Sequence, residues 1–514
     1  MKFHFIILSF LHLTISAQQI VQQKTTNYIS YSSSIDTTEN GGVIVGIATG
    51  DANNILYPNC ITNLNQTNSD VFVSKYDSNH NLIWRACLGT PFFDDVTAIK
   101  YLPDSSTIVA YTSQSYLSNL SRISKTGIVL WTRKFYDQNL PVFNNRPSCI
   151  NNIMSLSHNT ILISGFFNRN NGNFGVLKLD LQGNMIWEKY GGGNKALNNL
   201  IKTLDGGFMG VGVDYHNFYS SNPSEHISGF CTNFKGVSGN DIMLYKLDSL
   251  GNLEWKNCYG GTSNDNAYDI VQLADSSYVF LSGTTSQDID VNGNLDNNST
   301  LYHDIWLCRV SKVGSMIWSK CFGGSQTDIP SRIFKKNNGN VLICGTTTSY
   351  DKDLLFKRPY WDTSSDIWLF EIDASTKEII WQYVINQNGS ENLGFEERYN
   401  GGVSANRVGD VVFNEKTNML NITSTNGSSD YFGITNGWLI NIRVPNCTYQ
   451  KNLNSNIYLN LDIDQANYIN TTSIINSNSI VNFTGSNAIN INQGFTVENG
   501  VVFTAKIINE CGSK

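Results

Sequence analysis

The chain has 514 residues and a formal net charge of -7. Only 15% of the residues are charged and 12% are aromatic, a balance that favours a folded, β-rich protein over a disordered one. No run of basic residues is present, so nucleic acid is not an expected partner.

The first segment, residues 1–17, predicts a secretory signal peptide. Lys2 is followed by an apolar run that ends at the small residue Ala17. The run is short for a membrane span, and no later stretch approaches about 18 apolar residues, so we expect no transmembrane segment. The alternative is a buried N-terminal helix. We therefore expect a secreted or cell-surface protein whose mature chain starts near Gln18.

Six tryptophans mark a repeat that follows this segment, spaced 47 to 68 residues apart: Trp84, Trp131, Trp187, Trp255, Trp318 and Trp381. Each one lies in the last of four strand-like runs, typified by residues 267–275, 278–285, 304–310 and 315–322. Alternating β-branched and aromatic residues are typical of half-buried strands. A period of this length indicates a radial or stacked repeat.

The ends of the repeat predict how it closes. The second strand of the unit occurs seven times, whereas the tryptophan strand occurs six times, and the pattern stops at Pro445. Residues 18–25 have the alternation of the missing strand. If they pair beside residues 437–444, the ring hides its sheet edges. The predicted fold is an all-β, seven-bladed β-propeller over residues 18–445, closed by the N-terminal strand.

The connections within each unit divide the predicted ring into two faces. The first-to-second and third-to-fourth connections are tight turns such as D-x-x-G, in which Asp caps the turn and Gly takes a positive φ. His80 and Lys377 replace that Gly, so we expect those two turns to differ. The long connections all fall on the opposite face, where loops on a rigid scaffold commonly bind ligands.

The repeated motif resembles a known family. G-G-[ST]-x-x-D, a D/N-G turn, G-T-T and D-[IV]-W-L recur over most of residues 40–444. This pattern is similar to the SBBP-type β-propeller repeats of secreted, Bacteroidetes-like proteins, and the resemblance implies a scaffold without a catalytic set. Residues 446–514 predict a small β-stack, and the ending GFTVENGVVFTAKI is similar to three-coathanger stack domains. That resemblance implies attachment to the cell envelope.

Aromatic residues in the long connections are the candidate ligand-binding residues. Flat rings among amides and hydroxyls suit an extracellular glycan or protein. The alternative is that they tuck inward and pack beneath their own loops. The candidates are Phe92, Phe93, Tyr215, Tyr219, Tyr302, Tyr360, Trp361 and Tyr399.

One connection has the spacing of a calcium loop. Oxygen-bearing residues alternate, and Gly293 stands at the sixth position, as in D-x-D-x-N-G loops. The twelfth position is Ser299 rather than Glu, so the alternative is a solvated turn rich in Asp and Asn. The candidate calcium ligands are Asp288, Asp290, Asn292, Asn294 and Asp296. Calcium is the only cofactor that the sequence indicates.

Asp94, Asp265 and Asp328 recur in register five residues after a loop glycine, and we expect them to cap turns rather than to catalyse.

Ten cysteines in an exported chain suggest disulfides. Cys60 and Cys87 are as far apart as Cys231 and Cys258, which predicts two equivalent pairs. Cys447 and Cys511 bracket the C-terminal segment and predict a third. The other four are expected to be small buried hydrophobic residues: Cys149, Cys308, Cys321 and Cys344.

No nucleophile elbow, zinc motif or phosphate-binding loop is found. The sequence therefore favours a non-catalytic binding or adhesion scaffold. Two alternatives stay open. One is an enzyme on the same scaffold, glycan-active or resembling pyrroloquinoline-quinone propellers, although the adjacent Cys-Cys pair of those enzymes is absent. The other is a purely structural surface-assembly component.

Overall fold

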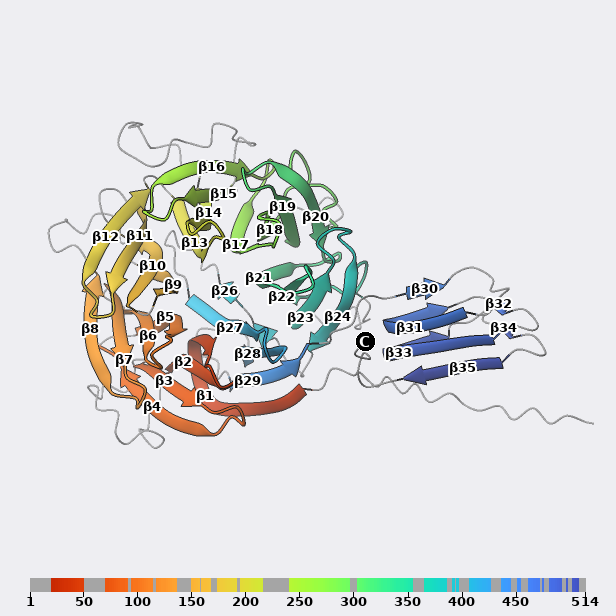
Figure 1. Ribbon diagram of the computed structural model, residues 1–514, viewed down its shortest axis with the longest axis horizontal. Coiled ribbons are helices and arrows are strands. Elements are labelled where there is room, and N and C mark those ends of the chain that lie inside the picture. The colour runs from red at the N-terminus through yellow and green to blue at the C-terminus, as the bar shows by residue number, and fades with distance from the viewer. Residues whose placement is uncertain are drawn as a thin grey trace, which may run out of the picture. The chain divides into compact units, whose positions relative to one another are not determined.

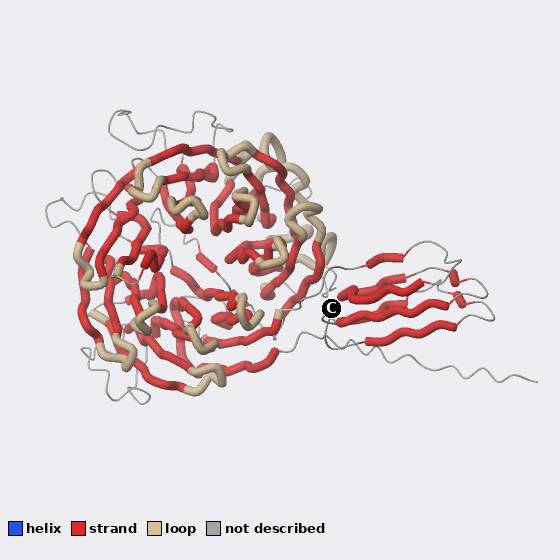
Figure 2. Tube along the Cα trace, in the orientation of Figure 1, coloured by secondary structure: helices blue, strands red, loops and turns tan. Residues whose placement is uncertain are grey.

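The computed structural model is built from strands, and its described residues contain no helix (Figure 2). Within that part of the chain, no helix has the length and hydropathy needed to cross a membrane. The structure describes residues 20–49, 70–90, 94–113, 117–135, 149–157, 159–167, 173–191, 195–215, 240–295, 303–354, 365–385, 391–392, 394–396, 406–426, 436–444, 451–453, 461–471, 474–475, 480–491, 496–497 and 502–507.

Five blades are antiparallel sheets of four strands that follow one another in the chain (Figure 1). Blade 2 contains β5 (Asp94–Tyr101), β6 (Thr107–Ser113), β7 (Leu117–Ile123) and β8 (Val129–Phe135). Blade 3 contains β9 (Cys149–Ser157), β10 (Thr160–Phe167), β11 (Asn173–Asp180) and β12 (Met185–Gly191). Blade 4 contains β13 (Lys195–Lys202), β14 (Phe208–Tyr215), β15 (Asn240–Leu247) and β16 (Leu253–Tyr259). Blade 5 contains β17 (Asp265–Gln272), β18 (Tyr278–Thr284), β19 (Asp304–Val310) and β20 (Met316–Phe322). Blade 6 contains β21 (Asp328–Lys335), β22 (Val341–Thr347), β23 (Asp366–Ile372) and β24 (Ile379–Ile385).

The other two blades share one long strand, β1 (Ile20–Thr37), which closes the ring. The sheet order runs β27-β28-β29-β1-β2-β3-β4, so β1 is the last strand of blade 7 and the first strand of blade 1. The predicted pairing of the N-terminal strand with the strand at residues 437–444 is confirmed by the pairing of β1 with β29, and the described sheets are consistent with seven blades. These two blades contain β2 (Val43–Thr49), β3 (Asp70–Tyr76), β4 (Leu82–Leu88), β27 (Asn406–Asn414), β28 (Met419–Asn426) and β29 (Asn436–Arg443), with β25 (Glu391–Asn392) and β26 (Gly394–Glu396) at the edge.

The hydrophobic core lies between neighbouring blades. One cluster joins Val211 and Ile242 of blade 4 to Ile270, Phe280 and Trp306 of blade 5, all of them buried. Strands with apolar residues on both faces can be buried from both sides in this way, because each sheet lies between two others.

Four of the repeat tryptophans pack from an outer strand onto the turn glycine of the next blade: Trp84, Trp131, Trp187 and Trp255. Nε1 of Trp84 donates to the carbonyl of Lys125 at 2.9 Å, and a Cβ on Gly127 would stand 3.1 Å from the indole ring. Trp131 donates to the carbonyl of Leu181 in the same way. Trp84 and Trp131 are therefore wedged between neighbouring blades. The glycine of the facing turn, Gly127 in blade 2 and Gly183 in blade 3, is needed for this close approach as well as for its positive φ.

The tight turns are capped as predicted, with one correction. Asp77 accepts hydrogen bonds from the backbone N–H groups of Asn79 and Asn81 at 2.9 and 2.7 Å. His80 takes a φ of 58°, so its turn has the same form as the glycine turns, and the expected difference there was wrong. Lys377, with a φ of 64°, lies in a turn that is one residue longer, as its hydrogen bond to the carbonyl of Asp373 shows.

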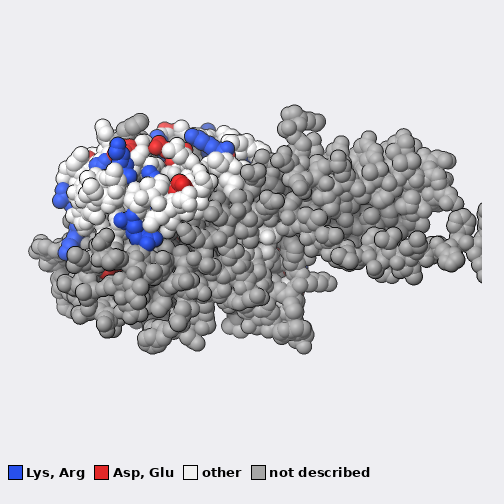
Figure 3. Space-filling view, turned by 90° about the horizontal axis from the view of Figure 1, so that it is seen from below, with Lys and Arg blue, Asp and Glu red and all other residues white. Residues whose placement is uncertain are grey.

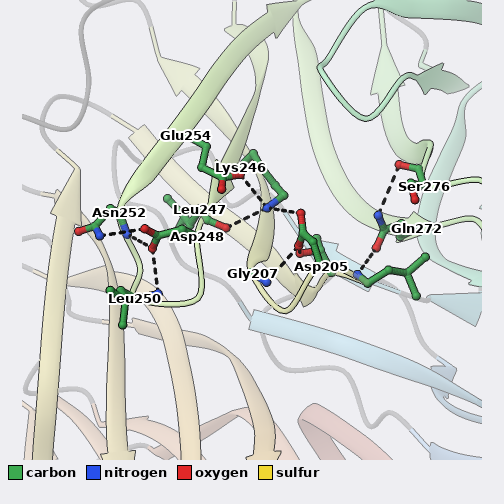
Figure 4. Close-up of polar contacts among 12 residues, drawn as sticks. Asp205, Gly207, Lys246, Leu247, Asp248, Leu250, Asn252, Glu254, Gln272 and Ser276 are labelled. Atoms are coloured by element: carbon green, nitrogen blue, oxygen red, sulfur yellow. Dashed lines mark hydrogen bonds and ion pairs between the residues drawn. The ribbon is translucent and has the colours of Figure 1, made fainter.

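Polar contacts reinforce the tight-turn end of blade 4 (Figure 4). Nζ of Lys246 lies 3.0 Å from a carboxylate oxygen of Asp205 and 2.9 Å from one of Glu254. Oε1 of Gln272, from blade 5, accepts the N–H of Leu204 at 2.7 Å, which ties the two blades together at this end.

A belt of polar side chains joins the inner strands of the blades. It follows a β-bulge that recurs in β5, β13, β17 and β21. Asn199 donates to Asp269, which also accepts a backbone N–H from β21 at 3.1 Å. Nε of Arg332 donates to Asp410 at 2.9 Å, and Asp410 accepts the hydroxyl of Ser34 at 2.9 Å. These contacts connect blade 4 through blades 5, 6 and 7 to blade 1.

The C-terminal residues form a separate parallel sheet, in agreement with the predicted β-stack. Its order is β30 (Lys451–Leu453), β31 (Leu461–Thr471), β33 (Ile480–Ile491) and β35 (Val502–Ile507). A two-stranded sheet pairs β32 (Ile474–Ile475) with β34 (Thr496–Val497). Residues 442–514 are assigned to one of the two compact units of the chain, which also includes residues 371–382. The proposed domain boundary at residue 446 stays a prediction.

Candidate binding face

The long connections leave the blades at the end opposite to the tight turns, because a four-stranded antiparallel sheet sends alternate connections to opposite ends. On this end the structure describes the connections 260–264, 285–295, 323–327 and 348–354 of blades 5 and 6. These segments show how the face is built.

In blade 5, the connection after β18 fastens to the connection before β17. Asp288 accepts the backbone N–H of Thr262 through Oδ1 and its hydroxyl through Oδ2, both at 2.8 Å. Asp290 accepts the N–H of Gly260 at 3.3 Å, and its own N–H returns a bond to the carbonyl of Gly260. Two loops far apart in sequence are thereby held at fixed positions.

Asp265 lies beneath this pair of loops. Its Oδ2 accepts the N–H of Gly261 at 2.8 Å and the hydroxyl of Ser286 at 2.9 Å, and its Oδ1 accepts the hydroxyl of Thr284. The side chain is completely buried. The expectation that this recurrent acid caps its loop is confirmed.

Blade 6 repeats the arrangement with different residues. Asp351 accepts the N–H of Ser325 at 2.8 Å, and Asp353 accepts the N–H of Gly323 at 3.2 Å. Asp328 accepts the N–H of Gly324 at 2.8 Å and the hydroxyl of Ser349 at 2.8 Å. We call this unit the loop latch: G-G-[ST]-x-x-D in one connection and S-x-D-x-D in the other. Sequence reasoning recognised the first half and missed the second, whose signal is the recurrence of S-x-D-x-D at residues 286–290 and 349–353.

Pairs of carboxylates converge on the first latch glycine. A Cβ on Gly260, whose φ is 159°, would stand 2.4 Å from Oδ1 of Asp241 and 2.7 Å from Oδ2 of Asp265. Gly323 has the same relation to Asp304 and Asp328. Only glycine leaves room for both acids at this point.

Burial raises the pKa of the recurrent acids Asp94, Asp265 and Asp328. It raises the pKa of Asp265 to about 6 and that of Asp328 to about 8, since both lose solvation that backbone and hydroxyl donors replace only in part. Asp304 raises the pKa of Asp328 further by repulsion. Asp94, which accepts the N–H of Thr90 at 2.6 Å, has its pKa raised to about 7 by the same burial.

The predicted calcium loop coincides with part of the latch. Asp288 and Asp290 hold the facing connection, and Nδ2 of Asn294 donates to the carbonyl of Ser286 at 2.9 Å. Asn292 is exposed, and Asp296 lies outside the described residues. Among the residues that the structure describes, no group of three or more His, Cys, Asp or Glu side chains is arranged to hold a metal ion. Calcium binding stays a prediction.

The predicted aromatic ligand residues fall almost entirely outside the described part of the chain. Tyr215 ends β14, but its side chain is not described. The remaining candidates lie outside the described residues: Phe92, Phe93, Tyr219, Tyr302, Tyr360, Trp361 and Tyr399.

The cysteines fall into two groups. Cys149, Cys308, Cys321 and Cys344 are free and buried, as expected of small hydrophobic residues. Cys87 and Cys258 occupy equivalent positions on β4 and β16 and are disulfide-bonded. The partners predicted for them, Cys60 and Cys231, lie outside the described residues, as do Cys447 and Cys511. The three pairings stay predictions.

No family model matches this chain, and no curated protein does. Among solved structures, hydrazine synthase from Kuenenia stuttgartiensis matches at 9% identity and a TM-score of 0.46, covering 79% of this chain and 98% of its own. The Dos1 propeller matches at 9% identity and a TM-score of 0.43, covering 84% and 97%. The β-propeller domain of the trilobed protease from Pyrococcus furiosus matches at 10% identity and a TM-score of 0.39, covering 80% and 94%.

Proposed function

We propose that this protein is a secreted or cell-surface scaffold that binds an extracellular glycan or protein on the face formed by its long connections, without catalysis. The observation that carries the proposal is the loop latch. It holds the bases of the connections in the same geometry in two adjacent blades, through Asp288 and Asp290 in one and Asp351 and Asp353 in the other. A rigid base beneath variable loops is the usual architecture of a binding face.

The chemistry of the buried acids supports binding rather than turnover. Asp265 and Asp328 have raised pKa values, which can mark general acids or bases. Each is completely buried, however, and accepts hydrogen bonds from a loop N–H and a serine hydroxyl. Their environment fits a structural cap, because a general acid or base must reach the substrate.

Within this proposal, the C-terminal parallel sheet serves as a display or attachment module. The propeller would carry the binding face, and the C-terminal unit would join it to the cell envelope. Within this proposal, the chain is an SBBP-like propeller followed by a three-coathanger-like stack.

A glycan array and a pull-down from the native cell surface test the proposal, with the signal-processed protein as bait. We expect a ligand that the double variant Tyr360→Ala, Trp361→Ala binds at least tenfold more weakly. The matched control is Leu204→Ala, an exposed residue in a tight turn at the other end of the ring, which should bind normally. Absence of any ligand, or substrate turnover by the purified protein, would contradict the proposal.

A further inference from the structure

Exposed aliphatic side chains gather on one part of each blade. We define the outer hairpin as the third and fourth strands with the turn between them. Of the thirteen exposed large hydrophobic residues in the described part of the chain, eleven lie in outer hairpins, with exposed fractions of 38% to 67%. They belong to blades 1 to 5, and we call them the aliphatic rim: Leu82, Ile83, Ile128, Val129, Leu130, Met185, Ile186, Leu250, Val313, Met316 and Ile317.

The rim lies at the tight-turn end of the ring. Each of its residues stands in the turn or in the first residues of the fourth strand: Leu250 is a turn residue, and Met185 and Ile186 begin β12. All tight turns of the blades point the same way, so the rim residues line the outer edge of one face. Single exposed aliphatic residues are ordinary, but their recurrence at the two positions before the tryptophan in blades 1, 2, 3 and 5 is not.

Packing within the ring does not account for these side chains. The tryptophan that follows them is the residue that contacts the next blade, as Trp84 does against Lys125 and Gly127. Leu82 and Ile83, just before it, remain about half exposed. Blade 6 provides a contrast, because Ile380 and Trp381 at the same positions are buried.

The outer hairpins of blades 2 and 5 have three rim residues each, and their charge differs from that of the outer hairpins of blades 1, 3 and 4. In blades 1, 3 and 4 an aspartate caps the turn, whereas Ser124 caps it in blade 2 and Ser311 in blade 5. Ser124 accepts the N–H of Ile128 at 3.0 Å, so the cap itself is preserved. Lys125 and Lys312 follow these serines. A negative charge is therefore absent, and a positive one present, where the aliphatic side chains are most numerous.

Basic residues continue along both hairpins. Arg133 and Lys134 lie on β8, Lys320 lies on β20, and residues 124–134 and 311–320 contain no Asp or Glu, although the whole chain has a net charge of -7. In the view of Figure 3, Lys and Arg cover more of the described surface than Asp and Glu do.

We propose that the tight-turn face of this propeller seats on an anionic lipid membrane surface. Aliphatic side chains at the tips of coplanar turns would enter the boundary between headgroups and acyl chains, and the neighbouring lysines would contact the headgroups. Basic residues near such a surface each add attraction to anionic lipids. Blades 2 and 5 are three blades apart around the ring. Contact of both outer hairpins with the membrane would therefore hold the tight-turn face parallel to the bilayer surface.

A lipid surface fits the rim better than a second copy of the chain does. Nine of the eleven rim residues are Leu, Ile or Val, whereas the cores of protein interfaces are enriched in aromatic residues and methionine. They stand on separate turns around the ring rather than in one closed patch, which suits a deformable surface. Seating at this end would leave the long connections directed away from the membrane.

Co-sedimentation of the signal-processed full chain with vesicles tests this proposal. We expect binding to phosphatidylglycerol–phosphatidylcholine vesicles, weaker binding at high salt, and little binding to pure phosphatidylcholine. The variant Ile128→Ser, Leu130→Ser, Val313→Ser, Ile317→Ser should bind at least tenfold more weakly. Ile289→Ser is the matched control, since Ile289 is exposed at the opposite end of the blades.

A second variant separates charge from folding. Ser124→Asp with Ser311→Asp restores the cap found in blades 1, 3 and 4 and changes only the charge, so the melting temperature should be kept while vesicle binding falls severalfold. Equal binding by this pair, by the fourfold serine variant, or to neutral vesicles would overturn the proposal. So would a dimer in sedimentation equilibrium that the serine variant abolishes, without vesicle binding, because the rim would then be an interface between copies.

Discussion

The two ends of each blade use aspartate for the same task in opposite surroundings. At the tight turns, Asp77 and Asp248 accept the side-chain amide of the asparagine four residues ahead and the backbone N–H groups two and four residues ahead. These hydrogen bonds lower the pKa of both exposed carboxyls. In the loop latch, Asp265 and Asp328 accept similar donors, yet burial raises their pKa. The difference shows that desolvation outweighs two or three hydrogen bonds once the side chain leaves water.

The largest expected consequence is a pH dependence of stability. Asp94, Asp265 and Asp328 have folded pKa values of about 7, 6 and 8, above the reference value of 3.8. The folded chain therefore holds protons that the unfolded chain releases, and this stabilisation is complete below pH 4 and is lost as the pH rises to about 8. Each carboxyl would contribute about 1.4 kcal/mol per pH unit between about pH 4 and its own folded pKa.

Urea unfolding at several pH values measures this effect. Asp328→Asn should flatten the profile between pH 4 and 8. Asp248→Asn should alter it only at more acidic pH, because a lowered pKa gives stability that is lost as the pH falls through it. An unchanged slope in Asp328→Asn would contradict the buried-acid interpretation.

Removing one latch carboxylate should cost more than removing one turn cap. Asp265→Ala leaves the N–H of Gly261 and the hydroxyls of Thr284 and Ser286 without their acceptor in a buried site, at a cost of about 3 kcal/mol in the free energy of unfolding. Asp248→Ala exposes its donors to water and should lower the melting temperature less. Equal losses in calorimetry would break the comparison.

Glycine substitutions separate backbone strain from packing at the tight-turn end. The Cβ of Gly206→Ala would meet no neighbouring atom within 4 Å. The variant should therefore lose only about 1 kcal/mol of the free energy of unfolding, because a non-glycine residue is strained in the left-handed backbone conformation. Gly251→Ala places a Cβ 2.7 Å from the ring of Trp187 and should cost roughly 2 kcal/mol more. Chemical denaturation of both variants measures the difference, and similar values would argue against close tryptophan packing.

The smallest effect is expected at Trp84. Trp84→Phe keeps an aromatic ring over Gly127 and loses the hydrogen bond to Lys125, worth about 1 kcal/mol. Trp381→Phe should cost more, because Trp381 donates to the buried carboxylate of Glu371 at 2.6 Å. Thermal melts of the two variants measure which substitution destabilises the fold more. A larger decrease in melting temperature for Trp84→Phe than for Trp381→Phe would contradict this prediction.

Local sequence patterns were enough to predict the fold. Contacts between segments that lie far apart in the sequence could not be predicted from these patterns. Strand alternation and the excess of second strands over tryptophan strands were enough to predict the closure by β1. The latch partners Asp288 and Asp351 were not predicted, because their role depends on a facing loop more than twenty residues away. The inner polar belt was missed since a bulge, which sequence periodicity does not reveal, directs Asp269 and Arg332 toward their neighbours.

Because β1 belongs to both the first and the last blade, the ring can close only after the last blade has been synthesised. Strand β1 also pairs with β29, which is made about 400 residues later. During synthesis this strand must wait without its partner until nearly the whole ring has emerged, and its open edge is a site for association with other chains. Closing so large a loop is slow relative to local pairing. Completion of the last blade, rather than formation of any single sheet, should therefore limit the rate at which the native ring appears.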